Sequence, residues 1–295
     1  MIIGAIIAGI APAIAQRIAT GSVVTPDGHR YASMGRGEKQ PRPFSLRLVA
    51  TWLPPTTEAW DIATISGLLM STIAVYFITL EMTCTENTAM FASALWGAMP
   101  YTRRLLVWPV LTDSLSLGLI AMTGLLALHA DNWFVVVAVS ALIIGGQYVH
   151  ERVTVHASVL AWFVTGSFLW FVPMVLGLWW YFVRYQTQDA HEEETTTDYL
   201  VSPMKTAIAN HRQVLFNARV WLLPWGASLA WLLSPSWQLG VVALASYAPC
   251  LVSVDRVRTY QANPFPFVIA SCMVIPVEWW LPAYLFTLFI SDGAN

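Results

Sequence analysis

Long apolar segments with few or no charges occupy most of this chain. A helix needs about 20 mostly apolar residues to cross a bilayer core of about 30 Å. Seven segments meet that requirement: 61–81, 105–128, 132–149, 157–183, 214–233, 237–253 and 266–290. Because a lipid environment forces the backbone to satisfy its own hydrogen bonds, such segments span a membrane as helices. The sequence therefore predicts an all-α fold, a polytopic helical bundle in a membrane.

Two further segments are apolar but short. Residues 1–16 carry no charge before Arg17, and residues 88–101 are too short for an easy crossing, which favours a re-entrant or interfacial helix. Cytosolic loops are enriched in Lys and Arg. If 1–16 spans and 88–101 does not, one side collects 12 of these residues and the other collects 3, namely Arg103, Arg104 and Arg152. We therefore predict seven or eight transmembrane helices.

The same count assigns loops to the cytosol. These loops are 17–60, 184–213 and 254–265, and a ninth, short span at 88–101 would leave the two sides nearly equal in Lys and Arg. No internal repeat is evident, so residues 1–295 are predicted to form a single membrane domain with polar loops at 17–60 and 184–213.

The composition excludes several classes of protein. Hydrophobic residues make up 57% of the chain and charged residues 11%, against about 25% charged residues in soluble domains. A soluble enzyme, a disordered chain and a nucleic-acid-binding protein are therefore excluded, and the net charge of −2 provides no basic field. We expect a lipophilic small molecule and membrane lipids as partners, and no nucleic acid.

Metal-binding spacings are missing from the sequence. Cys84, Cys250 and Cys272 form no ligand pair, and the segment His150–His156 lacks the i, i+4 histidines of a zinc helix. We therefore predict no metal site and no cofactor.

Asp113 is one of two acids placed where charge is expensive. A carboxylate at the bilayer centre costs about 2.5–3.5 kcal/mol. On a helix through 105–128, Asp113 shares one polar face with Thr112 and Ser116, which points to the bundle interior. Pro109 lies four residues earlier and breaks the helix. Two interpretations stay open: a functional carboxyl, or Thr112–Ser114 capping a helix that restarts after the proline.

Glu278 is the second such acid. It lies in the middle of 266–290, between Pro276 and Pro282, and Trp279 and Trp280 follow it directly. The prolines predict a broken helix, which membrane proteins tolerate where the break is buried or lines a cavity. The interpretations are again a functional carboxyl, or a structural acid bonded to a neighbouring helix.

The tryptophan content, 15 residues, exceeds what membrane interfaces normally hold. About five remain at predicted membrane depth and near the two acids: Trp108, Trp170, Trp225, Trp279 and Trp280. They are either packing residues of a large core or the lining of a pocket. Desolvated aromatic faces stabilise cations by about 2 kcal/mol or more.

A buried, neutral acid that faces an aromatic pocket suits one reaction in particular. Burial disfavours the charged carboxylate, so the acid can protonate an apolar substrate, and the aromatic faces then stabilise the resulting cation. Over residues 61–290 the general profile resembles the fungal membrane-bound terpene cyclases of meroterpenoid pathways, which have few lysines, many aromatics and isolated intramembrane acids. The resemblance implies metal-independent protonation of an epoxide or olefin on a prenylated aromatic substrate; it assigns no residue.

The predicted function is thus an integral membrane enzyme, most concretely a proton-initiated terpene cyclase, located in the endoplasmic reticulum membrane if the source is eukaryotic. Asp113 or Glu278 would be the general acid, and the other would tune it or remove the final proton. A proton-coupled transporter is an alternative, with the same acids as ion sites. A non-catalytic subunit is another, and predicts acids paired with arginine. The two-carboxyl mechanism requires that Asp113 and Glu278 face one internal cavity.

Overall fold

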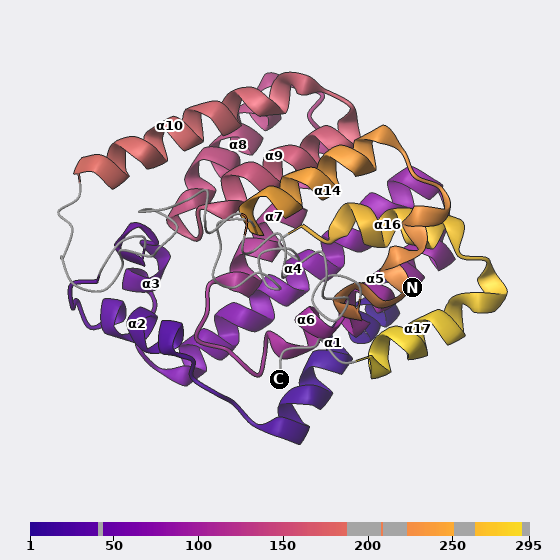
Figure 1. Cartoon of the computed structure of the whole chain (residues 1–295), viewed down its shortest axis with the longest axis horizontal. Helices are drawn as coiled ribbons and strands as arrows, with labels where there is room; N and C mark the ends of the chain where they lie inside the picture. The colour runs from indigo at the N-terminus through magenta and orange to yellow at the C-terminus, as the bar shows by residue number, and fades with distance from the viewer. Residues whose placement is uncertain (41–43, 188–207, 209–222, 251–262, 291–295) are drawn as a thin grey trace.

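Every regular element that the structure describes is a helix. The computed structural model describes residues 1–40, 44–187, 208, 223–250 and 263–290, and no strand occurs within these ranges. This confirms the all-α class. In Figure 1, α4 (Thr57–Thr83), α7 (Asp113–Leu128) and α9 (Arg152–Thr165) run through the middle of the bundle.

Small residues let the central helices approach closely. A Cβ added to Gly67 of α4 would overlap the carbonyl oxygen of Ser114 at the start of α7. One added to Gly97 of α5 (Glu86–Ala98) would overlap the carbonyl oxygen of Gly9 in α1 (Ile2–Thr20). Close backbone packing of this kind is how helices associate in lipid, where burial of apolar surface gives little driving force.

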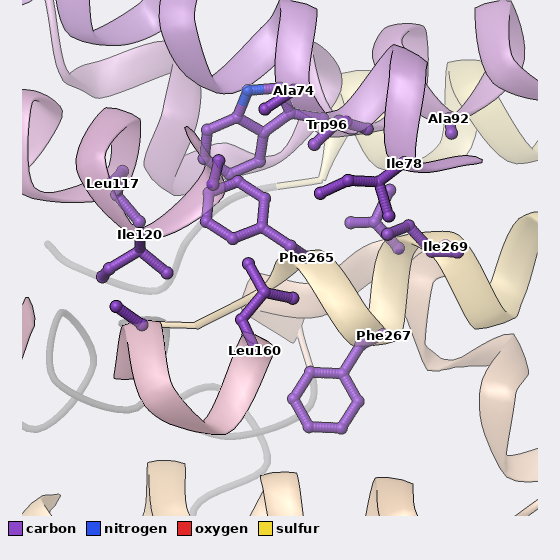
Figure 2. Close-up of a cluster of buried hydrophobic side chains, with 14 of the residues drawn as sticks. Ala74, Ile78, Ala92, Trp96, Leu117, Ile120, Leu160, Phe265, Phe267 and Ile269 are labelled. Carbon is purple, nitrogen blue, oxygen red and sulfur yellow. The ribbon is translucent and has the colours of Figure 1, made fainter. Parts of the chain in front are cut away.

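The apolar core lies where α4, α5, α7, α9 and α16 (Phe265–Val274) meet. Figure 2 shows Phe265 beside Trp96, with Leu117 and Leu160 nearby, and the first two rings have centroids 5.1 Å apart. The indole N–H of Trp96 donates to Ser71 Oγ at 3.2 Å, so the largest side chain in this region has its polar atom satisfied.

Three helical segments are long and apolar enough to cross a membrane. They are α1, α4 and Phe168–Thr187, the last formed by η3 (Phe168–Trp170) and α10 (Phe171–Thr187). A fourth results if α16 and the following Val277–Phe289, which are bent by 119° at their junction, count as one span. Among the described residues, seven or eight spans are therefore not confirmed.

The predicted span 157–183 is wrong. Helix α9 ends at Thr165, because Gly166 adopts the left-handed conformation (φ 71°) that closes a helix C-terminus. The chain then reverses, and the rings of Trp162 and Phe171 face each other at 5.9 Å. Hydropathy is uninterrupted through this turn, which is why the sequence suggests one long helix.

Proline breaks account for two further departures. Only Asp113–Leu128 of the predicted 105–128 is helical, since the chain leaves α6 (Pro100–Arg104) through an irregular segment around Pro109. The predicted span 266–290 bends sharply between α16, η5 (Val277–Trp279) and α17 (Trp280–Phe289), as its prolines indicate.

The other predicted spans correspond to shorter elements. Residues 132–149 hold α8 (Trp133–Gly145) and η2 (Gly146–Tyr148), residues 237–253 hold α14 (Trp237–Cys250), and residues 214–233 hold η4 (Leu223–Leu233). Residues 214–222 and 251–253 lie outside the described residues, as do most of the loop 184–213 and nearly all of the loop 254–265.

Helix α5 is buried inside the bundle, so the interfacial alternative predicted for 88–101 is wrong, whereas the re-entrant alternative is compatible with this position. It runs antiparallel to α4: the Ser93 hydroxyl donates to the Thr72 carbonyl at 3.5 Å, and Ala89 packs with Tyr76. Because α5 runs antiparallel to α4, Arg103, which follows α5, lies toward the end of the bundle where α4 begins. The Lys and Arg count places it on the opposite side because that count treats 88–101 as non-spanning.

The polar segment after α1 is folded onto the bundle. It contains α2 (Pro26–Gly35), η1 (Phe44–Leu46) and α3 (Val49–Trp52). The hydroxyl of Thr25 caps α2 by accepting from the Gly28 N–H at 3.1 Å, and a Cβ at Gly28 would meet the Val110 carbonyl at 2.9 Å. In Figure 1, α2 and α3 lie at the left end of the bundle.

Candidate functional site

Asp113 is buried at the first turn of α7, with 3% of its surface exposed. Its Oδ1 lies 2.5 Å from Nη2 of Arg152, whose side chain is 9% exposed. The guanidinium donates in addition to Ser116 Oγ, at 2.5 and 3.0 Å, and to the backbone carbonyl of Asp113 at 3.2 Å. The charge of Asp113 is therefore compensated by one cation from a different helix.

The local sequence explains why α7 starts at Asp113. Pro109 has no backbone N–H to donate, so it cannot continue a helix into α7. Its carbonyl accepts a hydrogen bond from Thr64 Oγ1 at 3.0 Å. Ser114 Oγ donates to the Thr64 carbonyl at 2.6 Å, so the restarted helix is fixed to α4. These contacts fit the interpretation in which Thr112–Ser114 restart the helix, and that role is compatible with a functional carboxyl.

A second ion pair lies beside the first in sequence. Glu151 precedes Arg152 and accepts two hydrogen bonds from Arg47, at 2.6 and 2.9 Å. Burial on its own raises the pKa of Glu151, but the charge and hydrogen bonds of Arg47 outweigh burial and lower it. Burial on its own lowers the pKa of Arg47, but Glu151 and Tyr31 outweigh burial and raise it above its usual value. Both groups of this pair stay charged.

Tyr31 joins the two ion pairs. Arg47 Nη1 donates to the Tyr31 hydroxyl, which lies 3.3 Å from Thr112 Oγ1. Burial raises the pKa of this phenol, so it stays neutral. Two peptide links close the circuit, between residues 112 and 113 and between residues 151 and 152. We call these six residues the polar ring: Tyr31, Arg47, Thr112, Asp113, Glu151 and Arg152.

A buried histidine lies one turn further along α9 and contacts a buried asparagine that lies just before α16. His156 is 1% exposed and Asn263 is fully buried; the amide of Asn263 donates to the His156 carbonyl at 3.2 Å. The Nδ1 atom of His156 and the Oδ1 atom of Asn263 have no hydrogen-bond partner among the described residues. Buried polar atoms are rarely left in this way, which marks the position as a place to look for function.

Glu278 does not join this site. It lies in η5 at the turn between α16 and α17, is exposed, and has no ion-pair or hydrogen-bond partner among the described residues. Figure 1 has this turn at the right end of the bundle, away from α2 and α3. Since Asp113 is buried and Glu278 is exposed, the two carboxyls do not face one internal cavity.

The five tryptophans do not form a single lining. Trp170 and Trp225 are buried in the main core, Trp280 is half-buried and stacks on Phe91 at 4.8 Å, and Trp279 is 60% exposed. Trp108 alone of the five packs against the hydrophobic cluster that contains Tyr31. The guanidinium of Arg104 lies 5.4 Å from its ring centroid, so this face already holds a cation.

Sequence reasoning misses most of the polar ring. The hydropathy pattern places Arg152 in an interfacial loop, and Tyr31 and Arg47 lie in a segment without periodicity. The available signal is charge order: Asp113 follows a helix break, and Glu151–Arg152 begins the helix that packs beside it. Within the described ranges, no three His, Cys, Asp or Glu side chains gather to hold a metal ion.

The fold and site together define an all-helical protein with candidate membrane spans and a buried ion-pair network at one end. Comparisons with protein-family models, with curated proteins and with solved structures found no match to this chain. The terpene cyclase resemblance therefore stays a prediction from the general profile.

Proposed function

We propose that this chain is an integral membrane enzyme that acts on a lipophilic, prenylated substrate by proton transfer at Asp113. Its most concrete form is a metal-independent terpene cyclase. The observation that supports it is the burial of a carboxyl and an imidazole, those of Asp113 and His156, beside an apolar core, with the guanidinium of Arg152 only 9% exposed. Apolar replacements of such groups are often neutral or stabilising, so their presence needs a reason other than stability.

The ion pair restricts how Asp113 can act. A guanidinium at 2.5 Å stabilises the carboxylate, so Arg152 has to release Oδ1 and the carboxylate has to take up a proton from water before Asp113 can donate one to the substrate. Arg152 has alternative acceptors in Ser116 Oγ and the Asp113 carbonyl, which hold it during that step. As a carboxylate, Asp113 instead suits the removal of the final proton or the stabilisation of a cationic intermediate.

The geometry also removes Glu278 from the proposed mechanism. The second polar role passes to His156, whose Nδ1 is without a partner among the described residues. A neutral imidazole can accept a proton or a hydrogen bond from the substrate. The pocket would be lined by core side chains close to Asp113 and His156, and the five tryptophans predicted from sequence would not all take part.

The test uses microsomes that contain the full chain and, as a probe, a farnesylated phenol with a terminal epoxide. Loss of a general acid or base lowers rates by about 10²–10⁴-fold. We expect that loss for Asp113→Asn and near wild-type cyclisation for Glu278→Gln, the matched control. Equal activity of both variants, with normal insertion and monodisperse extraction, would contradict the proposal.

The Asp113–Arg152 pair also favours a second candidate, a non-catalytic membrane subunit whose buried acid is only structural. In that case the double variant Asp113→Leu, Arg152→Met keeps every property of the wild type, because an apolar pair can replace an ion pair. If the protein is an enzyme, the same variant folds but forms no cyclised product.

A further inference from the structure

All Lys and Arg side chains in the described residues lie at one end of the bundle. Nine residues form this group, which we call the cationic end: Arg17, Arg30, Arg36, Lys39, Arg47, Arg103, Arg104, Arg152 and Arg184. They come from segments that are far apart in the sequence.

Hydrogen bonds and an ion pair fix several of these residues to neighbouring segments at this end. Arg184 at the end of α10 donates to the Leu46 carbonyl at 2.8 Å, next to Arg47 of the polar ring. Arg17 at the end of α1 donates to the Leu106 carbonyl at 2.7 Å and pairs with Asp61 of α4 at 3.1 Å. Helix α2, which contains Arg30 and is followed by Arg36 and Lys39, covers the same end, where the Tyr31 hydroxyl lies 3.3 Å from Thr112 Oγ1.

Among the described residues, the charged side chains at the opposite end are acids. Glu81, Glu86, Asp131 and Glu278 are exposed there, and no Lys or Arg of the described residues accompanies them. Glu81 and Glu86 flank the turn from α4 to α5, and Asp131 follows α7, which runs beside α4. Glu278 belongs to the same end because Trp280 stacks on Phe91, near the start of α5.

Exposed aromatic and aliphatic side chains mark both ends. At the cationic end, Trp52 is 70% exposed in α3 and Val23 is half exposed just before α2. At the acidic end, Trp133, Trp237 and Trp279 are each about 60% exposed, as membrane-interface tryptophans are. Exposed tryptophans at both ends of an apolar bundle are what a protein seated across a bilayer carries.

We infer that the cationic end contacts the anionic headgroups of the cytosolic leaflet. The described residues 21–40 and 44–56 then lie in the headgroup layer, with Trp52 and Val23 inserted among the lipids and the exposed Lys39 facing anionic headgroups. The polar ring then lies toward the cytosolic side of the bundle. This orientation rests on charge distribution and does not depend on the proposed reaction.

The chain contains a natural reporter of this orientation. Cys84 is an exposed, free cysteine at the end of α4, on the acidic end, whereas Cys272 is buried. In sealed microsomes, whose cytosolic face is outward, a membrane-impermeant maleimide reaches only the cytosolic end. We expect Cys84 to be labelled only after detergent is added.

A matched cysteine variant tests the accessibility of the cationic end. Thr51 is exposed in α3, so Thr51→Cys in a Cys84→Ser background should be labelled without detergent, and Cys84→Ser alone gives the baseline. Labelling of Cys84 in sealed microsomes, or protection of the Thr51→Cys variant until detergent is added, overturns the orientation. Cyclisation assays on the same microsomes report separately on the proposed function.

Discussion

The start of α7 and the turn between α16 and α17 combine the same three kinds of residue in different surroundings. Each has a proline, a carboxyl group and a nearby tryptophan. At the start of α7 the helix restarts inside the bundle, so Asp113 is buried and bound by Arg152. At the other turn the helices diverge by 119°, and Glu278 is exposed with no partner among the described residues. A proline therefore does not decide whether a nearby acid is buried; the helices packed around the break do.

Asp113→Asn and Glu278→Gln give the largest expected contrast between the two regions. The first removes the acid that the proposed chemistry uses, and the second changes only an exposed carboxyl. We expect the cyclisation rate to fall about 10²–10⁴-fold in the first variant and to stay near wild type in the second. A loss of the same size in Glu278→Gln would remove the functional distinction between the two regions.

Arg152→Met tests the stability side of the comparison. It leaves Asp113 as a buried charge without its guanidinium, which costs about 3–5 kcal/mol in the free energy of unfolding. The double variant Asp113→Leu, Arg152→Met should recover most of that loss. Thermal unfolding in detergent, with Glu278→Gln as the control that changes stability by less than about 0.5 kcal/mol, measures both effects.

Trp280→Ala and Trp279→Ala sharpen the comparison within the turn itself. Trp280 stacks on Phe91 at 4.8 Å and donates from its indole N–H to the Ile275 carbonyl at 3.0 Å. Its truncation should cost about 2 kcal/mol, below the range for a fully buried tryptophan because it is half-buried. Trp279 is 60% exposed, so its truncation should cost clearly less. Equal losses in unfolding temperature would contradict this difference.

The smallest expected effect is on the pH dependence of stability, through the Arg47–Glu151 pair. The folded-state pKa of Glu151 is lowered from an ordinary value near 4.5, so the unfolded chain binds a proton at higher pH than the folded one. The stability from Glu151 is present above that ordinary value and is lost as pH falls through the folded-state pKa. In unfolding measured across this pH range, Glu151→Gln should flatten this part of the stability profile.

Apolar segments and prolines in the sequence predict where several helices lie and where they bend or restart. The apolar segment 61–81 lies within α4, the prolines around Glu278 predict the bend between α16 and α17, and Pro109 predicts the restart of α7. The turn at Gly166 escapes prediction because the residues on both sides are equally apolar. A single glycine in the left-handed conformation decides that turn, and glycine is also common within membrane helices.

The candidate site is predictable only in part because its contacts are long-range. Asp113 stands out by its cost in an apolar helix, but nothing near it in sequence indicates Arg152. The partners Tyr31 and Arg47 lie in a polar segment whose composition suggests a solvated loop. Their burial depends on η1 and α2 docking against the start of α9, a packing event that no periodic pattern encodes.

The Asp113–Arg152 pair also constrains how the chain is made. Arg152 lies 39 residues after Asp113, so at ordinary rates of synthesis it emerges about 2–8 s later. The carboxyl therefore enters its apolar helix before its cation exists in the nascent chain. Helix α7 has to wait, held by the earlier α4 through Gly67 and Thr64, until α9 arrives and the pair closes. The order of synthesis thus makes α4 the template on which the charged interior is assembled.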